Sequence, residues 1–190
     1  MVFADHIKAA DSATLPQLIY RLLPELVDLG SIATISGSLE LTQYTKGALV
    51  INLSNGVSYN LILSNTGTGV LLSGSITAQA QTDCTRCTDE TQLSIEADVD
   101  CYYIIDRKYH DMAEEDDSSV IVGDDGKVDL AEPIIAALVY EIPFTVLCQE
   151  NCAGLCDKCF ANLNYEECTC KDEPDPDHPL AALRTLFDAE

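Results

Sequence analysis

The spacing of hydrophobic residues separates a helical stretch at the start of the chain from a long region of strand-like runs. Between residues 12 and 29, apolar side chains recur at the three- and four-residue intervals of an amphipathic helix. Ser12 is suited to cap this helix and Gly30 to end it, although Pro24 should break or kink it. From Ile32 to Ile105 the chain is made of short runs rich in Val, Ile, Leu, Thr and Tyr, which predict an antiparallel sheet.

Two features within this region predict where the sheet turns. Asn55-Gly56 stands between two strand-like runs and predicts a hairpin, because both residues tolerate positive φ. Residues 70–83 alternate apolar and polar side chains as a half-buried strand does, and residues 93–99 repeat the alternation. The segment from Cys84 to Asp89 should therefore form the turn that joins two strands.

The next segment combines an acidic stretch with an apolar one. Residues 106–125 are acidic and poor in core residues, which predicts a solvated loop whose negative run lies at 111–117. Asp129 should cap the apolar segment that follows, 130–142, whose spacing favours a helix over a buried strand. Pro143 should end this helix, because proline disfavours helical backbone in the residue before it.

Together these elements predict an α+β fold. We expect an N-terminal helix, an antiparallel sheet of about five to seven strands that is either open or barrel-like, and a helix crossing the sheet. Residues 1–147 would form this body. Residues 148–190 would form a small cysteine-rich zinc-knuckle module that ends in a short helix over residues 180–187.

Composition and charge narrow the classes of function. Hydrophobic residues make up 47% of the chain, which predicts a globular core, and the 6% aromatic content makes that core mainly aliphatic. The 10 basic and 32 acidic residues give a formal net charge of −22. Such a charge argues against wrapping nucleic acid or lying on anionic lipid, so any RNA contact would have to be local.

Two kinds of segment that the sequence lacks indicate the cellular compartment in which we expect the protein. No run approaches the roughly 18 apolar residues that cross a bilayer, and residues 1–20 do not show the basic and then apolar order of a secretory signal. We therefore expect a cytoplasmic protein with no membrane partner. In a reducing compartment, nine cysteines indicate metal or redox chemistry rather than a disulfide framework.

Eight of the nine cysteines fall into four close pairs. Such pairs are typical of zinc sites, because one short turn can aim two thiolates at one ion. The spacing favours one site made from the last two pairs and another that clips the C-terminal module to the sheet, with free buried cysteines or partial disulfides as the alternative. The predicted ligands are Cys156, Cys159, Cys168 and Cys170 for one site, and Cys84, Cys87, Cys148 and Cys152 for the other.

Nothing in the sequence indicates catalysis. A four-cysteine site has no open position for water, so we expect one or two structural Zn²⁺ ions. The ninth cysteine, Cys101, lies on a strand-like run and is expected to be a small buried residue. His6, His110 and His178 lie in polar segments and should face solvent. Because Gly-rich phosphate loops, GxSxG and HExxH motifs are missing from the sequence, we predict that the protein is not an enzyme.

A set of motifs runs in order from about Leu72 to Leu186. They are Gly74-Ser75-Ile76-Thr77-Ala78 before Cys84-Thr85-Arg86-Cys87, Val128-Asp129-Leu130, Glu141-Ile142-Pro143, Cys148 to Cys170 with Gly154-Leu155-Cys156 and Asn162-Leu163-Asn164, and Asp175-Pro176. In this order the chain resembles the bacterial YceD family, also called the large ribosomal RNA subunit accumulation protein family, in its multi-cysteine zinc-binding form.

The resemblance implies a non-enzymatic cytoplasmic factor needed for accumulation of large-subunit ribosomal RNA, through its synthesis, processing or assembly. It assigns the paired cysteines as metal ligands and Arg86 as the family's arginine. Three residues depart from the family pattern: Phe160 stands where glycine is common, and Ala153 and Asp177 stand where basic residues are common. Because these basic residues are missing, direct rRNA contact has little support. We expect instead an acidic adaptor that binds ribosomal proteins or assembly factors of the large subunit.

Two other interpretations remain open at the sequence level. A thiol redox switch with releasable zinc is one, because CxxC and CxC centres can lose metal on oxidation. An enzyme with a cysteine nucleophile is the other, and it is disfavoured because no histidine stands near a cysteine pair in the sequence.

Overall fold

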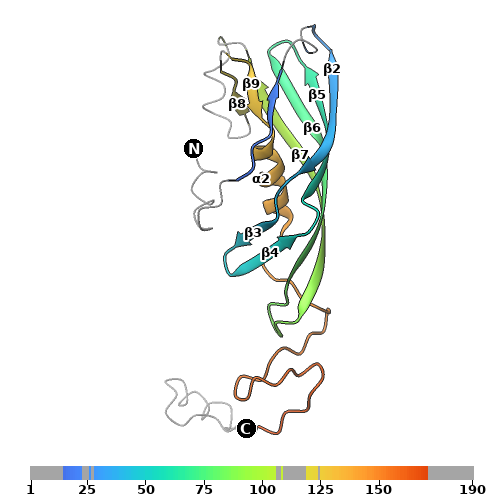
Figure 1. Ribbon diagram of the computed structural model, residues 1–190, viewed down its shortest axis with the longest axis vertical. Helices are drawn as coiled ribbons and strands as arrows, with labels where there is room; N and C mark the ends of the chain where they lie inside the picture. The colour runs from blue at the N-terminus through green and yellow to red at the C-terminus, as the bar shows by residue number, and fades with distance from the viewer. Residues whose placement is uncertain are drawn as a thin grey trace, which may run out of the picture.

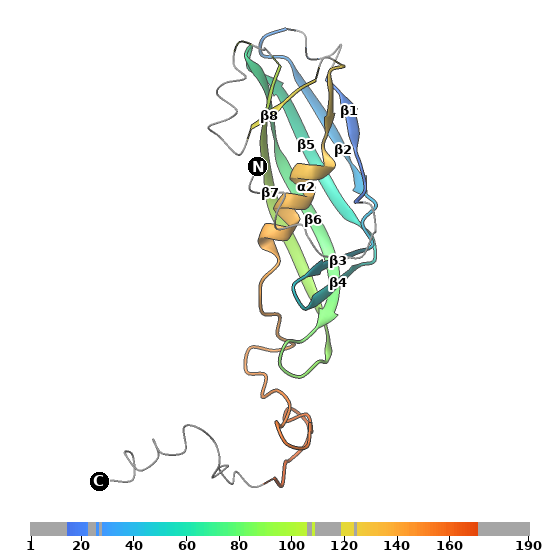
Figure 2. The same ribbon diagram turned by 90° about the vertical axis from the view of Figure 1, so that its left-hand side faces the viewer.

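A long antiparallel sheet carries one helix on one face and a cysteine-rich segment at one end in this computed structural model (Figures 1 and 2). The structure describes residues 15–22, 26, 28–105, 108, 119–123 and 125–170. The strands are β1 (Ile19–Arg21), β2 (Ile32–Leu39), β3 (Gln43–Lys46), β4 (Leu49–Leu53), β5 (Val57–Asn65), β6 (Gly69–Asp83), β7 (Glu90–Ile104), β8 (Ser119–Ile121) and β9 (Lys127–Asp129), and the helix is α2 (Ala131–Glu141).

Strand β6 is the centre of the main sheet. Both β5 and β4 pair with it antiparallel, β7 also pairs with it antiparallel over its whole length, and β8 pairs with β7 in parallel. In the described part of the chain, β2 pairs only with β5, β3 only with β4, and β8 only with β7. These strands are therefore open edges, and the barrel-like alternative for the sheet is wrong.

The turn predicted at Asn55-Gly56 is present, but it does not form a hairpin. It joins β4 to β5, and Leu53 of β4 lies opposite Ala80 while Ser58 of β5 lies opposite Thr77. The two strands thus follow one another along β6, which is long enough to pair with both. The chain reverses instead between β3 and β4, at Gly47, whose φ is 62°.

Helix α2 covers the face of the sheet formed by β6 and β7 (Figure 2). The predicted cap, Asp129, lies one residue before the N-cap position, which is Leu130, and its Oδ1 accepts the backbone N–H of Ala131 at 2.9 Å. The C-terminal end of α2 is held by Lys46, whose Nζ donates to the carbonyls of Val139, at 2.8 Å, and Ile142. The largest fully buried side chains are Tyr103, Ile51, Leu53, Leu61, Leu63, Leu72, Ile76, Leu130, Ile134, Leu138, Ile142 and Val57.

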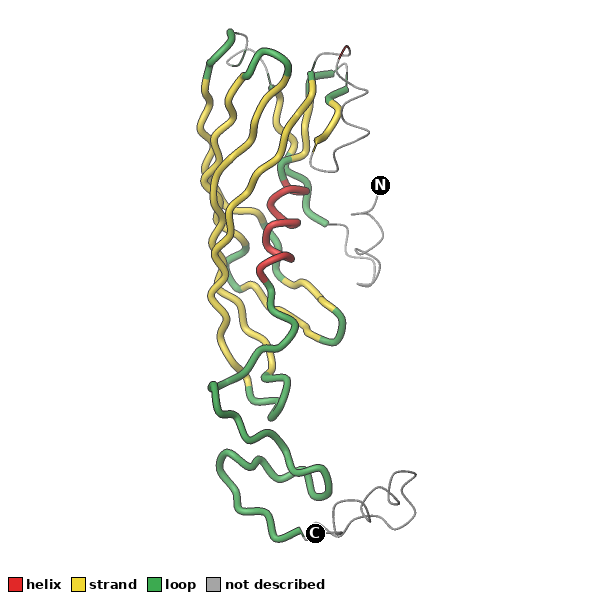
Figure 3. Tube along the Cα trace, turned by 180° about the vertical axis from the view of Figure 1, so that it is seen from behind, coloured by secondary structure: helices red, strands yellow, loops and turns green. Residues whose placement is uncertain are grey.

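The predicted N-terminal helix is wrong, and with it the α+β arrangement, because the described chain is mostly sheet (Figure 3). Residues 19–21 form β1, which pairs antiparallel with β9. Leu22 and Leu26 are buried in the main core, whereas Leu15 and Ile19 of the same apolar pattern are exposed. The apolar spacing thus predicts burial correctly only in part of the segment. The 19–21 backbone forms its hydrogen bonds with β9, whereas Pro24 would interrupt a helix.

Several predicted features lie outside the described residues. They are the acidic run at 111–117, the short helix at 180–187, and the three histidines His6, His110 and His178. Cys101 is described, and it is buried in the sheet core as predicted. Among the described residues, no helix has the length and hydropathy needed to cross a membrane.

Candidate metal centres

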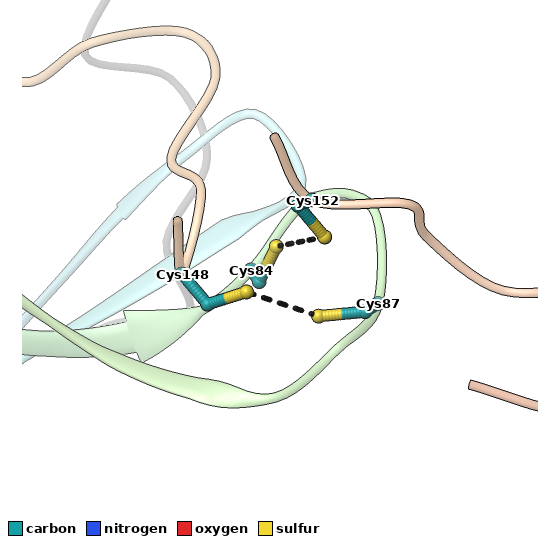
Figure 4. A group of neighbouring side chains, drawn as sticks. All are labelled: Cys84, Cys87, Cys148 and Cys152. Carbon is teal, nitrogen blue, oxygen red and sulfur yellow. Dashed lines mark hydrogen bonds between the residues drawn. The ribbon is translucent and has the colours of Figure 1, made fainter. Parts of the chain in front are cut away.

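The turn between β6 and β7 meets the segment that follows α2, and four cysteine side chains converge there (Figure 4). We call Cys84, Cys87, Cys148 and Cys152 the first cluster. The turn is attached to the incoming segment by Thr85, whose backbone N–H and Oγ1 both donate to the carbonyl of Val146, at 2.8 and 3.1 Å. This attachment explains how two pairs separated by 60 residues of chain reach one point, and it places the first cluster at the end of the sheet.

Cysteines further along the same segment form a second cluster. We give this name to Cys156, Cys159, Cys168 and Cys170, whose sulfur atoms also lie within 4.8 Å of one another. The first cluster is largely buried, whereas Cys159 and Cys170 of the second are exposed. The structure therefore brings together the two groups of four that the spacing predicts.

The distances between sulfur atoms suit a tetrahedral ion. A metal–sulfur bond of about 2.3 Å places the ligands of a tetrahedral site about 3.8 Å apart. In the first cluster Cys84 Sγ lies 3.7 Å from Cys152 Sγ, and Cys87 Sγ lies 3.5 Å from Cys148 Sγ. In the second cluster Cys168 Sγ lies 3.6 Å from Cys159 Sγ and 3.3 Å from Cys156 Sγ. Both clusters consist of unbridged thiols at the spacing that one ion requires.

Two turns of the same shape present the CxxC pairs. In each, the N–H of the first cysteine donates to the carbonyl five residues later, Cys84 to Asp89 at 2.8 Å and Cys156 to Ala161 at 2.9 Å. The residue after the second cysteine donates back to the first, from Thr88 and Phe160, both at 2.9 Å. Such knuckles direct backbone N–H groups at the first sulfur and point both thiols to one side.

These N–H groups make the first thiol of each knuckle acidic. Burial alone would raise the pKa of Cys84, but backbone N–H groups of Cys87, Arg86 and Cys148 outweigh burial and lower the pKa to about 6. Backbone N–H groups of Cys159 and Lys158 lower the pKa of Cys156 to about 7. Burial raises the pKa of Cys87. Each knuckle thus favours one thiolate without a metal, and a bound cation would favour the rest.

Phe160 stands where the family commonly has glycine, and its backbone has the left-handed conformation that glycine adopts easily. Phe160 has a φ of 58°, and Thr88 at the matching position of the first knuckle has a φ of 60°. Left-handed backbone costs a residue with a Cβ roughly 1–2 kcal/mol. Both knuckles therefore carry local strain that glycine would not have.

We expect Phe160→Gly to stabilise the second cluster by about 1 kcal/mol, because glycine relieves the left-handed strain and Phe160 is 72% exposed, so little packing is lost. The measurement is the urea midpoint for loss of metal. Ala161→Gly is the control, since it adds the same backbone freedom next to the knuckle, where φ is not positive. Equal destabilisation by both substitutions would contradict the assignment of strain to Phe160.

Arg86 ties the first knuckle to the rest of the cysteine-rich segment. Its Nη1 donates to the carbonyl of Cys152 at 3.0 Å, and its own carbonyl accepts the N–H of Leu155 at 3.2 Å. The resemblance to the YceD family identifies Arg86 as a family residue but assigns it no structural or functional role. Its hydrogen bonds indicate that it joins the two halves of the first cluster.

Sequence reasoning missed three polar residues beside the first cluster. Asp89 accepts a hydrogen bond from the thiol of Cys87 at 3.2 Å, and Asn164 Nδ2 donates to Cys152 Sγ at 3.4 Å. Asn162 Nδ2 donates to both oxygens of Asp89 at 3.0 Å. The Asn162-Leu163-Asn164 motif was the available signal, but spacing alone gave it no partner.

Comparisons with known proteins point to the same family as the sequence motifs do. The profile of the family described as large ribosomal RNA subunit accumulation protein YceD matches residues 72–187. An uncharacterized protein of Mycobacterium tuberculosis is 30% identical over 139 residues, which cover 73% of this chain and 63% of that protein. An uncharacterized protein of Mycobacterium leprae is 26% identical over 161 residues, or 80% of this chain and 74% of that protein.

A plant protein carries the functional description. The chloroplastic large ribosomal RNA subunit accumulation protein YCED homolog 1 of Arabidopsis thaliana is 38% identical over 60 residues, or 30% of this chain and 19% of that protein. No solved structure matches the chain. The chain covers less than two thirds of the length of the Mycobacterium tuberculosis relative. Because the matching profile extends over more than half of the chain and includes both cysteine clusters, the chain belongs to the YceD family of large ribosomal RNA subunit accumulation proteins.

Proposed function

We propose that this chain is a non-enzymatic, cytoplasmic zinc protein that supports the accumulation of large-subunit ribosomal RNA. The observation that carries the proposal is a pair of four-cysteine clusters, each with its sulfur atoms within 4.8 Å of one another, in a chain of this family. Four thiolates at tetrahedral spacing suit Zn²⁺, and such a site leaves no position for substrate or water. Zinc would therefore hold the cysteine-rich segment in shape rather than perform chemistry.

The charge of the surface supports an adaptor that binds proteins. On the face of β7 turned away from α2, Glu96, Asp98 and Asp100 occupy three successive exposed positions. Their neighbours on β6 are Thr77, Ser75 and Ser73, none of which carries a positive charge. We call these three carboxylates the β7 acidic stripe. With a net charge of −22, the chain should attract basic ribosomal proteins or assembly factors of the large subunit and repel bare rRNA.

The basic residues of the described part of the chain give little support to phosphate binding. Lys46 holds the end of α2, Arg86 bonds the carbonyl of Cys152, and Lys127 pairs with Asp125 at 3.3 Å. Lys108 and Lys158 also have partners, and Arg21, exposed on β1, is a single residue rather than a patch. An RNA backbone is usually held by a patch of uncommitted Lys and Arg.

Affinity capture of the tagged chain from its own cells tests the adaptor. We expect large-subunit proteins to be recovered after nuclease treatment. A variant that neutralises the β7 acidic stripe, Glu96→Gln, Asp98→Asn and Asp100→Asn, should lose most of this recovery. The control variant neutralises three exposed carboxylates elsewhere on the chain and so changes the net charge by the same amount. Its substitutions are Asp28→Asn, Glu40→Gln and Glu150→Gln.

The outcomes separate the partner classes. If the stripe variant and the control lose the same share of recovered large-subunit proteins, the total charge of the chain, and not this face of the sheet, attracts the partner. Recovery that depends entirely on intact RNA would contradict the adaptor and favour direct rRNA contact. Depletion of the chain should also lower large-subunit rRNA relative to small-subunit rRNA, and normal rRNA levels would contradict the family role for this chain.

One observation favours a redox switch as a second function. Cys159 and Cys170 of the second cluster are exposed, so a peroxide can reach them. Two thiolates would lose two electrons to form a disulfide, hydrogen peroxide would take up these electrons and two protons from solvent to give two water molecules, and the zinc ion would be released. Zinc retained in full after mild peroxide treatment would remove this function.

A further inference from the structure

The loop between the two pairs of the second cluster reaches back to the first cluster. Asn164 lies in this loop, and its amide makes four hydrogen bonds. Its Oδ1 accepts the N–H of Ala153 at 2.8 Å and Nε2 of Gln149 at 3.0 Å. Its Nδ2 donates to Asn162 Oδ1 at 2.9 Å and to the Cys152 sulfur at 3.4 Å. The full capacity of the amide is used, which fixes its orientation with the N–H group directed at the ligand sulfur.

A second contact from the same loop acts on the other side of the first cluster. Asn162 Nδ2 donates to both carboxylate oxygens of Asp89, and one of these oxygens lies 3.2 Å from the Cys87 sulfur. The Asn162 Oδ1 accepts the backbone N–H of Asn164 at 3.1 Å as well as its side chain. The two asparagines are therefore one hydrogen-bonded unit that touches both halves of the first cluster.

We infer that Asn164, held in place by Asn162, is a positioning residue that keeps metal in the first cluster, so that the second cluster controls how fast the first one loses its ion. An N–H group directed at a thiolate withdraws charge from it and holds it in place. Loss of such outer partners typically costs 10–100-fold in metal affinity. Because the asparagines are carried between Cys159 and Cys168, closing the second cluster fixes both ends of their loop, whose middle is held by the Leu163 N–H bond to the Gly154 carbonyl at 2.9 Å.

The inference rests on the proposal that the clusters bind zinc, and its test uses the full chain loaded with zinc. A chromogenic chelator in excess measures the release of each ion, and the release phase that is absent from the Cys84→Ser variant belongs to the first cluster. Asn164→Asp should speed this release about tenfold or more, since it replaces an N–H donor by a carboxylate beside the thiolate. Asn164→Ala should have a smaller effect in the same direction. The matched control is Asn151→Asp, an exposed residue next to Cys152 that makes the same change of charge.

A spectroscopic readout separates positioning from folding. With Co²⁺ in place of Zn²⁺, loss of the N–H partner should move the thiolate-to-cobalt absorption to longer wavelength in Asn164→Asp and Asn164→Ala, while the circular dichroism of the sheet stays unchanged. The Cys168→Ser/Cys170→Ser variant should release the remaining ion faster than the wild type does. If the wild type binds two ions and the Asn164 variants show unchanged release and absorption, this inference is overturned while the zinc proposal stands. A wild-type chain that binds no metal would overturn the zinc proposal and this inference together.

Discussion

Replacing Cys84 by serine should reduce the bound zinc from two ions per chain to one and detach the segment after α2 from the end of the sheet. Structural zinc sites contribute about 10–16 kcal/mol of apparent binding free energy. Around the first cluster, the other buried contacts are a small apolar group in which Leu147 and Leu155 join the cysteines. That group cannot replace a contribution of this size. Metal analysis and limited proteolysis should show fewer ions and new cleavage between residues 146 and 170.

The sheet itself should survive this substitution. Its core is a separate cluster, mainly of β-strand and α2 side chains, that includes no cysteine of either cluster. Far-ultraviolet circular dichroism should therefore remain close to that of the wild type. Cys101→Ala is the control, because it removes the one cysteine that lies in the sheet core and should leave both ions bound. Full zinc content in the Cys84→Ser chain would contradict the assignment of this residue as a ligand.

The candidate site could be predicted far better than the fold around it. The spacing of close cysteine pairs is enough to indicate a candidate metal site, because a four-thiolate site needs little more than two short turns that each present two cysteines. The sequence therefore identified which pairs the structure brings together. It could not assign Asn162, Asn164 or Asp89, since their partners lie across the module and only the folded chain brings them near the sulfur atoms.

The errors in the fold have a common physical cause. Local patterns predicted burial correctly at Leu22 and Leu26, and alternation correctly along β6 and β7. They could not reveal that β9 would pair with residues 19–21, or that β4 and β5 would both pair with β6, one after the other along its length. Both choices depend on partners distant in sequence, which override local preference.

Gly74→Ala should lower the stability of the sheet by about 3 kcal/mol, at the upper end of what overpacking costs. A Cβ at this position would lie 2.2 Å from the carbonyl oxygen of Asn60 and 2.9 Å from the Cα of Leu61. Both atoms belong to the backbone of β5, which is paired with β6 on one side and β2 on the other. Because neither atom can move alone, the methyl group would have to push two strand pairs apart. This requirement gives a physical reason for the glycine in the motif that precedes Cys84.

The urea midpoint of the sheet measures this effect, and Gly123→Ala provides the control. Within the described part of the chain, a Cβ at Gly123 would meet only Asp125 Oδ1, at an ordinary contact distance of 3.4 Å, so this substitution should change the midpoint little. An unchanged slope would show that Gly74→Ala acts on stability and not on the compactness of the unfolded chain. Zinc content should stay at two ions per folded chain, since the clash lies in the sheet and the first cluster is held by its own turn and ligands. Equal midpoints for the two variants would mean that β5 can yield without loss of pairing, and the close approach of the strands at Gly74 would then carry no energetic cost.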